Sequence, residues 1–404
     1  MKSDTATSVA PRSPVATLMA MAAKLQAVGT ETVDLSLAVG RVLAQDLLAD
    51  RDNPACDVSA MDGYALRVAD LARGSVAVAG EARTGQTPEV LAADQAMKIV
   101  TGAPVPNGAE AVIRREDVQE YPDHIGVRAG ASLAAGENIR TQGQNIRAGE
   151  RVVEAGRVLT PALAGALASF GLWRPRVYRA LRLGIIVTGD ELLSPDSKPN
   201  VWQLRDSNGP ALEAMVAGCP WLDWQQTWHV ADDLEETRTA LADALQECDV
   251  VLMTGGVSMG DRDYAQVAVG QVKATVEFHG LPIRPGKPML GAIGTKGQAI
   301  LGLPGNPVSV LVTARRLGAI VLRTLAGFEV VDPPVPMVVV DLPDVSNPEL
   351  WLYRPVKLSG DGAAQILPTK GSGDLVSAAR GDGFVEIPPG TEGEASRTYY
   401  GWQL

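Results

Sequence analysis

Cysteine, histidine and aromatic residues are scarce in this chain of 404 residues. The three cysteines, Cys56, Cys219 and Cys248, lie far apart and form no CxxC pair, which argues against a disulfide framework or a zinc site. The three histidines have no metal-ligand spacing, and no Ser-His-Asp order or nucleophile elbow is visible. Aromatic residues make up only 4% of the chain. The sequence therefore argues against covalent catalysis and against aromatic stacking platforms.

Positive charge and long apolar runs are lacking as well. The formal net charge is −11, whereas a protein that binds nucleic acid usually presents a basic surface. No apolar run approaches the roughly 18 residues of a membrane span, and Met1–Ala16 has no signal-peptide core. We therefore predict a cytoplasmic protein that binds neither nucleic acid nor membranes. The tail Met1–Ser13 is expected to be disordered.

The chain does contain enough apolar sequence for several cores. Its length predicts about two to four domains. Pro14–Leu48 has the apolar spacing of a helix, a turn and a second helix. From Asp50 to Gly143, short β-like segments alternate with turn clusters, which predicts a small β module. A further helix is expected at Ala162–Ser169, with Thr160 as its N-cap, so the chain is expected to leave one domain and return to it.

The middle of the chain alternates apolar strands with helices. This alternation predicts a parallel sheet that helices cover on both faces. The expected strands are Leu181–Val187, Thr227–Val230, Val250–Thr254, Val276–His279, Met289–Ile293 and Ala299–Leu301. The expected helices are Pro210–Ala217, Leu234–Glu247, Tyr264–Val269 and one from Pro307. The Pro-rich run 332–336 indicates a linker, and a small β unit is expected beyond it.

Three acidic loops follow the first three of these strands. They are Thr188–Glu191, Asp232-Asp233 and Thr254–Asp263. Ligands bind beyond the carboxyl ends of the strands in open α/β sheets, and the third loop combines glycines with two carboxylates. This combination suits Mg²⁺ that bridges a phosphate-containing substrate. The structural alternative is that Asp232 caps the next helix and Asp190 forms a turn.

Cationic and hydroxyl side chains recur at turns. Arg284 and Lys287 flank a turn that two prolines make rigid, and Ser309 lies at a helix N-terminus that attracts anions. The alternatives are a solvated hairpin turn and a purely structural cap. In the β module, Asp62, Thr101 and Arg140 occupy turn-rich segments and are unremarkable taken singly. Each of these positions needs a further observation before it can be assigned.

Seven segments together resemble the molybdopterin molybdenumtransferase family, which comprises bacterial MoeA and the E-domain of gephyrin. They follow the family's order over nearly the whole chain: Ser59–Ala65 (SAMDGYA), Val100–Ala109 (VTGAPVPNGA), Gly136–Arg140 (GENIR), Thr188–Leu192 (TGDEL), Thr254–Tyr264 (TGGVSMGDRDY), Ile283–Pro288 (IRPGKP) and Leu303–Ser309 (LPGNPVS).

The resemblance implies a multidomain α/β plus β fold with four domains. The central, doubly covered α/β domain is expected to be similar to molybdopterin adenylyltransferase. The implied boundaries are 10–49 with 145–179 for a discontinuous helical domain that dimerises, 50–144 for a β insert, 180–329 for the central domain and 330–404 for a small β-barrel. The resemblance also implies a homodimer, in which the β insert of one subunit faces the central domain of the other.

The family's activity implies roles for individual residues. Members hydrolyse adenylylated molybdopterin with Mg²⁺, insert molybdate into the dithiolene and release AMP, and molybdopterin adenylyltransferase is the implied upstream partner. By motif, the catalytic residues would be Asp62, Glu191, Asp232, Asp263 and Lys287, of which Glu191, Asp232 and Asp263 would bind the metal. Substrate would contact Thr101, Arg140, Gly255, Gly256, Ser258, Arg284, Ser309, Arg354 and Ser372.

Three positions depart from the family pattern. The family commonly has an acid where this chain has Asn145, and many members have a lysine where this chain has Gly280. Arg284 replaces a second lysine and keeps its charge with a forked geometry. Two other hypotheses therefore remain: a paralogue that handles tungstate, and a non-catalytic scaffold that binds molybdopterin.

Overall fold

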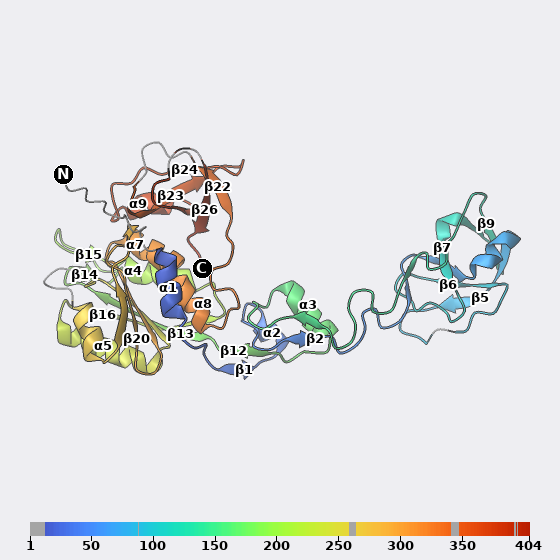
Figure 1. Cartoon of the computed structure of the whole chain (residues 1–404), viewed down its shortest axis with the longest axis horizontal. Helices are drawn as coiled ribbons and strands as arrows, with labels where there is room; N and C mark the ends of the chain where they lie inside the picture. Colours follow the sequence, from blue (N-terminus) through green and yellow to red (C-terminus); the bar gives the residue numbers. More distant parts are fainter. Residues whose placement is uncertain (1–12, 88, 258–263, 341–346, 392, 394) are drawn as a thin grey trace, which may run out of the picture. The chain divides into compact units, whose positions relative to one another are not determined.

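The computed structural model describes residues 13–87, 89–257, 264–340, 347–391, 393 and 395–404. The chain forms two compact units. Unit 1 comprises residues 1–45, 155–165 and 173–404, and unit 2 comprises residues 46–154 and 166–172. Figure 1 shows the two units, with unit 2 built from the segments coloured blue to green. The four-domain division of the sequence, with its residue boundaries, stays a prediction.

A mixed six-stranded sheet is the centre of unit 1, with strand order β16-β13-β17-β21-β20-β18. The strands are β13 (Leu181–Thr188), β16 (Leu222–Val230), β17 (Val250–Thr254), β18 (Thr275–His279), β20 (Leu290–Ile293) and β21 (Ala299–Leu303). The first four strands in the sheet order are parallel, as predicted, but β20 and β18 pair antiparallel. The prediction of an all-parallel sheet was wrong at this edge, because apolar strands in short succession have the same pattern in either direction.

Alternate residues of the central strands point to opposite cores. In β17, Val250 and Leu252 belong to one buried cluster, whereas Val251 and Met253 belong to another. Helices cover both faces, as predicted. The first face packs on α1 (Pro14–Ala22), α4 (Asn208–Val216), α7 (Pro307–Val312) and α8 (Ala319–Leu325), and the second on α5 (Leu234–Glu247) and α6 (Ala265–Gln271).

The order in which successive strands are added to the sheet reverses at β13. The strand that follows β13 in the chain, β16, pairs on one side of it, and β17 pairs on the other. All three strands are parallel, so the loops after them leave the same edge of the sheet. Such a switch point is where ligands bind in open α/β sheets.

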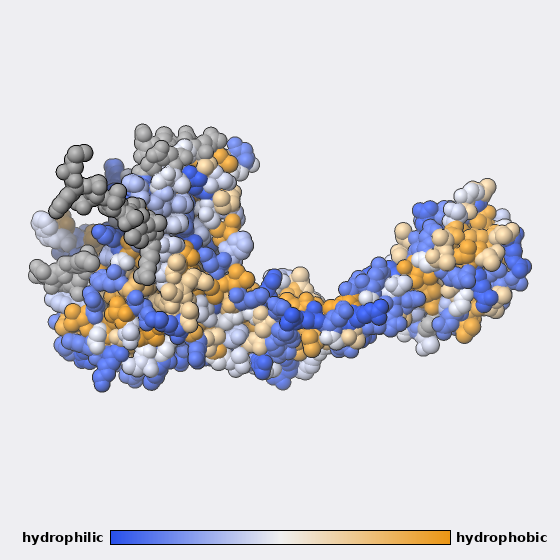
Figure 2. Space-filling model, in the orientation of Figure 1, coloured by the Kyte–Doolittle hydropathy of each residue, from blue (hydrophilic) through white to orange (hydrophobic). Residues whose placement is uncertain are grey.

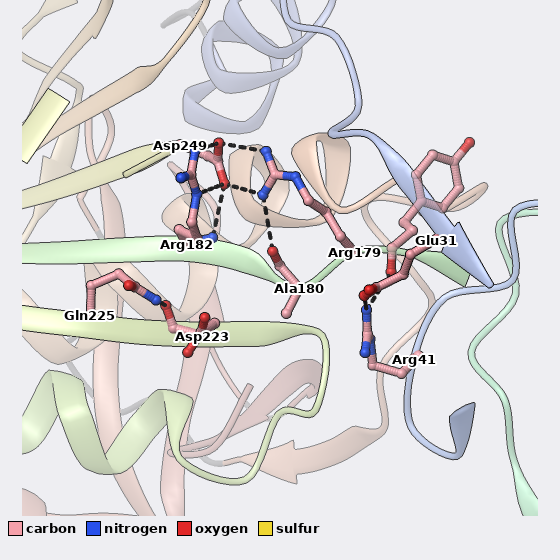
Figure 3. A network of polar contacts seen from close by, with 9 residues as sticks. Glu31, Arg41, Arg179, Ala180, Arg182, Asp223, Gln225 and Asp249 are labelled. Carbon is pink, nitrogen blue, oxygen red and sulfur yellow. Dashed lines mark hydrogen bonds and ion pairs between the residues drawn. The ribbon is translucent and has the colours of Figure 1, made fainter. Parts of the chain in front are cut away.

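A cluster of charged residues joins the first residues of β13 and β17, at the edge of the sheet opposite to this switch point. The Asp249 carboxylate accepts hydrogen bonds from the Arg179 guanidinium at 2.6 and 2.8 Å and from the Arg182 backbone at 2.9 Å. The Arg182 guanidinium adds a contact at 3.1 Å. Figure 3 shows Asp249 between the two arginines. These contacts fix the start of both strands.

A small β-barrel follows the linker, as predicted. Its strands are β19 (Ile283–Arg284), β22 (Met337–Val340), β23 (Trp351–Leu358), β24 (Ala364–Ile366), β25 (Gly383–Ile387) and β26 (Ala395–Gly401). The pairing runs β19-β23-β25-β26-β22, with β24 beside β23. A β-bridge between Val339 in β22 and Ala363, directly before β24, joins the two ends of this strand order and closes the barrel. Neither β26 nor α9 (Leu375–Arg380) was predicted from the sequence.

The segment after α1 does not form the predicted second helix. Only α2 (Leu35–Ala38) is helical, and Gly40 then adopts a φ of 80°, which ends a helix. Val42 and Leu43 form antiparallel bridges to Val158 and Val177 instead. Their backbone is therefore extended and not helical, and their apolar side chains are buried. Unit 1 also contains β1 (Thr30–Thr32), β12 (Arg176–Tyr178), β14 (Leu192–Leu193), β15 (Leu204–Arg205) and α3 (Pro161–Ser169), whose last residues belong to unit 2.

Unit 2 is rich in β structure, as predicted. Its main sheet has the order β7-β4-β6-β5-β9-β8, with separate pairs β10-β3 and β11-β2. The strands are β2 (Leu47–Leu48), β3 (Val58–Ser59), β4 (Gly63–Leu66), β5 (Ser75–Ala82), β6 (Gln95–Ile99), β7 (Ala111–Arg114), β8 (Val118–Glu120), β9 (His124–Val127), β10 (Ile139–Arg140) and β11 (Arg151–Val153). Neighbouring residues Tyr64 and Ala65 enter different buried clusters, one on each face.

The surface mixes polar and apolar residues. Blue and orange areas are interspersed on the face shown in Figure 2. No helix of the described chain is both long enough and apolar enough to cross a membrane.

Candidate functional site

A cavity of about 620 Å³ lies at the edge of the sheet where β13, β17 and β21 end. Four predicted site residues line it: Glu191, Asp232, Gly255 and Gly256. Ser258 and Asp263 lie outside the described residues. The cavity therefore brings together the two described acidic loops and the start of the glycine loop, as the switch point of the sheet predicts.

The glycine loop needs its glycines for steric reasons. Gly255 has a φ of 90°, and a Cβ on it would lie 2.4 Å from the Thr188 carbonyl oxygen. Gly256 has a φ of 59°. Any side chain at Gly255 would collide with the end of β13, so the backbone itself lines this part of the cavity.

The structure distinguishes the positions of Asp190, Asp232 and Asp233, for which the sequence left both a structural and a functional role open. Asp233 is the N-cap of α5 and accepts a hydrogen bond from the Glu236 backbone at 2.9 Å. Asp190 Oδ1 accepts from the Asp232 backbone at 3.0 Å. Asp190 lies in a turn, as the structural alternative predicted. The N-cap of α5 is Asp233, whereas that alternative had named Asp232. Asp232 itself lines the cavity.

Sequence reasoning missed Asp206 and Asn208, which line the same cavity. Asp206 is 3% exposed and accepts hydrogen bonds from the Asn208 and Gly209 backbones at 2.9 and 3.1 Å. Its other carboxylate oxygen lies 3.0 Å from His229 Nε2. The available signal was an Asp shortly before a helix and an Asn at its first residue, a pattern that usually indicates capping only.

A second cavity, of about 780 Å³, lies between the central sheet and the barrel. Five predicted site residues line it: the predicted catalytic Lys287 and the predicted substrate contacts Arg284, Ser309, Arg354 and Ser372. Lys370 and Asn347, which were not predicted from the sequence, also line it. The backbone of Val308, at the start of α7, donates to the Ser372 carbonyl at 3.1 Å, so the barrel loop is fixed against the α7 N-terminus.

The second cavity is cationic. Within the described residues, Arg284, Lys287, Arg354 and Lys370 form no ion pair with a carboxylate. Arg354 Nε is buried without a described partner. Burial, and secondly the nearby charge of Arg284, lower the pKa of the Arg354 guanidinium from its ordinary value. Uncompensated positive charge in a cleft favours an anionic ligand.

The two cavities adjoin. Pro288 and the loop Pro304–Asn306 line both of them. This loop connects β21 to α7, with Asn306 at the N-cap position; the helix begins at Pro307, as predicted. An acidic cavity and a cationic cavity therefore share one wall, and a ligand with both kinds of group could contact each.

In unit 2, Asp62 and Thr101 lie together. Asp62 Oδ1 accepts hydrogen bonds from the Thr101 backbone and hydroxyl, both at 2.8 Å. These two bonds lower the pKa of the Asp62 carboxyl from its ordinary value. Arg140 instead donates to Asn145 Oδ1 at 2.8 Å. The structure thus joins two of the three predicted residues and gives the third a different partner.

Oxygen donors suited to a hard cation are present in the acidic cavity. The carboxylates of Glu191 and Asp232 line it. The described residues contain no group of three or more His, Cys, Asp or Glu that could hold a metal ion. This donor set fits Mg²⁺ in chemical type, and the predicted third carboxylate, Asp263, lies outside the described residues.

Together, fold and site define a multidomain protein with a ligand cavity at the switch point of a central α/β domain. Three parts of the chain match known family regions. Residues 13–171 match the MoeA N-terminal region (domain I and II), residues 184–324 a probable molybdopterin binding domain, and residues 346–396 the MoeA C-terminal region (domain IV).

Relatives of similar length give the same result. The molybdopterin molybdenumtransferase of Synechocystis sp. is 32% identical over 369 residues, which are 89% of this chain and 91% of the relative. The protein of that name from Synechococcus elongatus is 32% identical, over 94% of this chain and 98% of the relative. A crystal structure of the molybdopterin biosynthesis moeA protein from Pyrococcus horikoshii aligns with a TM-score of 0.81 and 28% identity, over 97% of this chain and 100% of that one.

The chain therefore belongs to the MoeA family. The predicted family and multidomain fold class are confirmed, and so is the prediction of a transferase in molybdenum cofactor biosynthesis.

Proposed function

We propose that this protein is a molybdenum insertase, which hydrolyses adenylylated molybdopterin in a Mg²⁺-dependent reaction, inserts molybdate into the dithiolene and releases AMP. The observation that carries the proposal is the pair of adjoining cavities, one acidic and one cationic. The proposed substrates need both. A phosphoanhydride and an oxyanion require cations, and a hard metal ion requires carboxylates.

The cationic cavity is proposed to hold molybdate and phosphate oxygens. Lys287 and Arg284 would supply charge from one side and Arg354 from the barrel, with Ser309 and Ser372 as hydroxyl donors. Fixed donors that face developing negative charge stabilise a transition state without reorganisation at the moment of reaction. Arg284 and Lys287 are held by a turn in which a Cβ on Gly286 would lie 2.6 Å from Thr313 Cγ2, so this turn is closely packed.

The acidic cavity is proposed to hold Mg²⁺ through Glu191, Asp232 and Asp263. When bound there, Mg²⁺ would neutralise charge on the phosphoanhydride oxygens. Gly255, Gly256 and Ser258 would bring backbone and hydroxyl donors to the same phosphates. The hydrolysis adds water across the phosphoanhydride, so one phosphate stays on molybdopterin and the other leaves with AMP.

The assembly is part of the same proposal. Asp62, with Thr101 and Arg140, is proposed to act on the cavity of the other subunit of a homodimer. Molybdopterin adenylyltransferase is the proposed upstream partner, because it would supply the adenylylated substrate. The cytoplasmic location stays a prediction.

The test is AMP release from adenylylated molybdopterin by the purified protein, with and without Mg²⁺ and molybdate. Release that both stimulate, with a molybdenum-loaded product, would support the insertase. Tight binding without release would instead support the scaffold hypothesis. Competition between molybdate and tungstate in the same assay would reveal a paralogue that handles tungstate.

A further inference from the structure

The acidic cavity contains two buried polar atoms for which the described chain offers no partner. These atoms are Asn208 Oδ1 and Thr188 Oγ1. Asn208 is 7% exposed and Thr188 is 6% exposed, and both residues line the cavity. Buried polar groups in proteins nearly always have a hydrogen-bond partner. The two atoms therefore indicate a ligand contact at this position.

The orientation of the Asn208 amide is fixed by its partners. Nδ2 donates to the Gly305 carbonyl at 2.8 Å and to Thr254 Oγ1 at 2.9 Å. A carbonyl can only accept, so the nitrogen and not the oxygen must face Gly305. The Thr254 hydroxyl in turn lies 3.3 Å from the Pro304 carbonyl, to which it donates. Both amide hydrogens are thus used, and only the acceptor Oδ1 remains.

Asn208 is also held rigidly from its backbone. Its N–H donates to the buried Asp206 carboxylate at 2.9 Å. Gly209 packs so closely on the same carboxylate that a Cβ would lie 2.5 Å from Asp206 Oδ2. A rigid acceptor loses little entropy when a ligand donor reaches it, which is the basis of preorganised recognition.

Thr188 is the last residue of β13 and lies against the glycine loop. A Cβ on Gly255 would be 2.5 Å from Thr188 Oγ1, and one on Gly256 would be 3.3 Å from it. The two glycines therefore leave the hydroxyl uncovered by side chains from their own loop. A hydroxyl can accept a hydrogen bond as well as donate one.

We propose that Asn208 and Thr188 form a subsite that accepts hydrogen bonds from an amino group on a heteroaromatic ring of the ligand. The inference rests on the proposed function, because the adenine and the pterin of the proposed substrate each carry such a group. Asn208 Oδ1 can only accept, and the carboxylates of Asp206, Glu191 and Asp232 line the same cavity. An anionic group is therefore disfavoured at these two atoms, away from the proposed metal ion.

The sharpest variant is Thr188→Val, which nearly keeps the shape of the side chain and removes a hydroxyl without a described partner. Its free energy of unfolding should match the wild type or exceed it, because no internal hydrogen bond is lost. The matched control is Thr324→Val, since the Thr324 hydroxyl donates to the Ile320 carbonyl within α8, at 2.9 Å. That variant should lose stability and keep ligand affinity.

Calorimetric binding should use two matched pairs of probes on the full-length protein. AMP is compared with purine riboside 5′-monophosphate, and 6-hydroxymethylpterin with 6-hydroxymethyllumazine; the second member of each pair lacks the amino group. We expect the wild type to prefer one aminated probe by about tenfold, the effect of one buried acceptor left without a donor. Thr188→Val should weaken this preference without abolishing it, because Asn208 Oδ1 still accepts, and Thr188→Ser should retain it. The pair that shows the effect identifies the ring.

The outcomes separate this inference from the proposed reaction. Equal affinities of the wild type and Thr188→Val for all four probes, or no binding of any probe, would overturn the subsite. If the amino preference is present and is weakened in Thr188→Val while no AMP is released from the adenylylated substrate, the subsite stands and the reaction is rejected. If AMP is released and the probes bind without any amino preference, the reaction stands and the subsite is rejected.

Discussion

Arg316 and Glu386 form an ion pair in which both side chains are only 7% exposed. Arg316 lies in the π-helical segment Thr313–Gly318 of the central domain, and Glu386 lies in β25 of the barrel. Arg316 also contacts Asp332 at 2.8 Å. The guanidinium thus joins the central domain, the linker and the barrel. Residues of the central domain and of the barrel also line the cationic cavity.

Arg316→Met should therefore destabilise the protein strongly. The substitution leaves the Glu386 carboxylate buried without its cation, which typically costs about 3–5 kcal/mol. Urea unfolding at pH 7 measures the loss. Arg238→Met is the control, because Arg238 pairs with Glu235 on an exposed face of α5 and should cost less than about 1 kcal/mol. Similar losses in the two variants would contradict the prediction.

The Asp249 cluster should make stability depend on acid pH. Burial favours the protonated form, but hydrogen bonds from Arg179 and Arg182 outweigh it and lower the pKa of Asp249 from 3.8 to about 2. Because the folded-state pKa is the lower one, the stabilisation is present above pH 4 or so and is lost as the pH falls toward 2. It amounts to about 2 kcal/mol at neutral pH.

Unfolding of the wild type and Asp249→Asn at pH 7 and pH 3 tests this. We expect the variant to be less stable at pH 7 and the difference between the two proteins to shrink at pH 3. An equal difference at both pH values would show that the Asp249 charge is not responsible.

Lys287→Met should impair the proposed reaction more than the fold. Lys287 lines the cationic cavity and has no ion-pair partner among the described residues, so its charge is available to a ligand. We expect kcat/KM for AMP release to fall by about a hundredfold or more, with little change in the free energy of unfolding. Lys296→Met, at an exposed turn after β20, should leave both quantities unchanged. A thermal or urea midpoint that falls with activity would instead indicate a structural role.

Mixed dimers should reveal whether two subunits share a site. Asp62→Asn and Asp263→Asn are each expected to abolish turnover and to preserve folding. If Asp62 acts on the partner subunit, heterodimers of the two variants contain one intact site and should recover roughly half of the activity. Verified heterodimers without activity would count against a shared site, and unfolding or monomerisation of Asp263→Asn would make that residue structural.

Asn145→Asp should have little effect on activity. Asn145 already accepts a hydrogen bond from Arg140 at 2.8 Å, so the aspartate keeps this contact and adds charge at an exposed position, worth less than about 1 kcal/mol. It loses the donor that Asn145 offers to Asn53 Oδ1 at 2.7 Å. We expect AMP release within a few-fold of the wild type. A large gain would mean that the missing acid limits the natural protein.

The alternation of strands and helices was predictable from the sequence, because burial on both faces gives the central strands continuous apolar runs. The predicted bounds of α5 and β17 agree with the structure. The direction of β20, which runs antiparallel to both β21 and β18, was not predictable, since apolar runs do not encode strand direction. The second helix predicted within Pro14–Leu48 is cut short before Gly40. The reason is that Val42 and Leu43 form long-range bridges, which no local sequence pattern reveals.

The site was predicted in part for a related reason. Loops after parallel strands must meet at one edge, so Glu191 and Asp232 could be placed together from topology alone. Asp206 and Asn208 looked like ordinary capping residues. Their role in the cavity depends on contacts to Thr254, Gly305 and His229, which are distant in the sequence and become neighbours only on folding.

The loop Pro304–Asn306 has a consequence for how this protein can evolve. It lines both cavities, so a substitution in it alters the environment of two ligand groups at once. Residues such as Lys370 or Leu204 line only one cavity and can change with less interference. Adaptation to a different oxyanion should therefore accumulate in the barrel loop around Lys370, while the shared wall tolerates little variation.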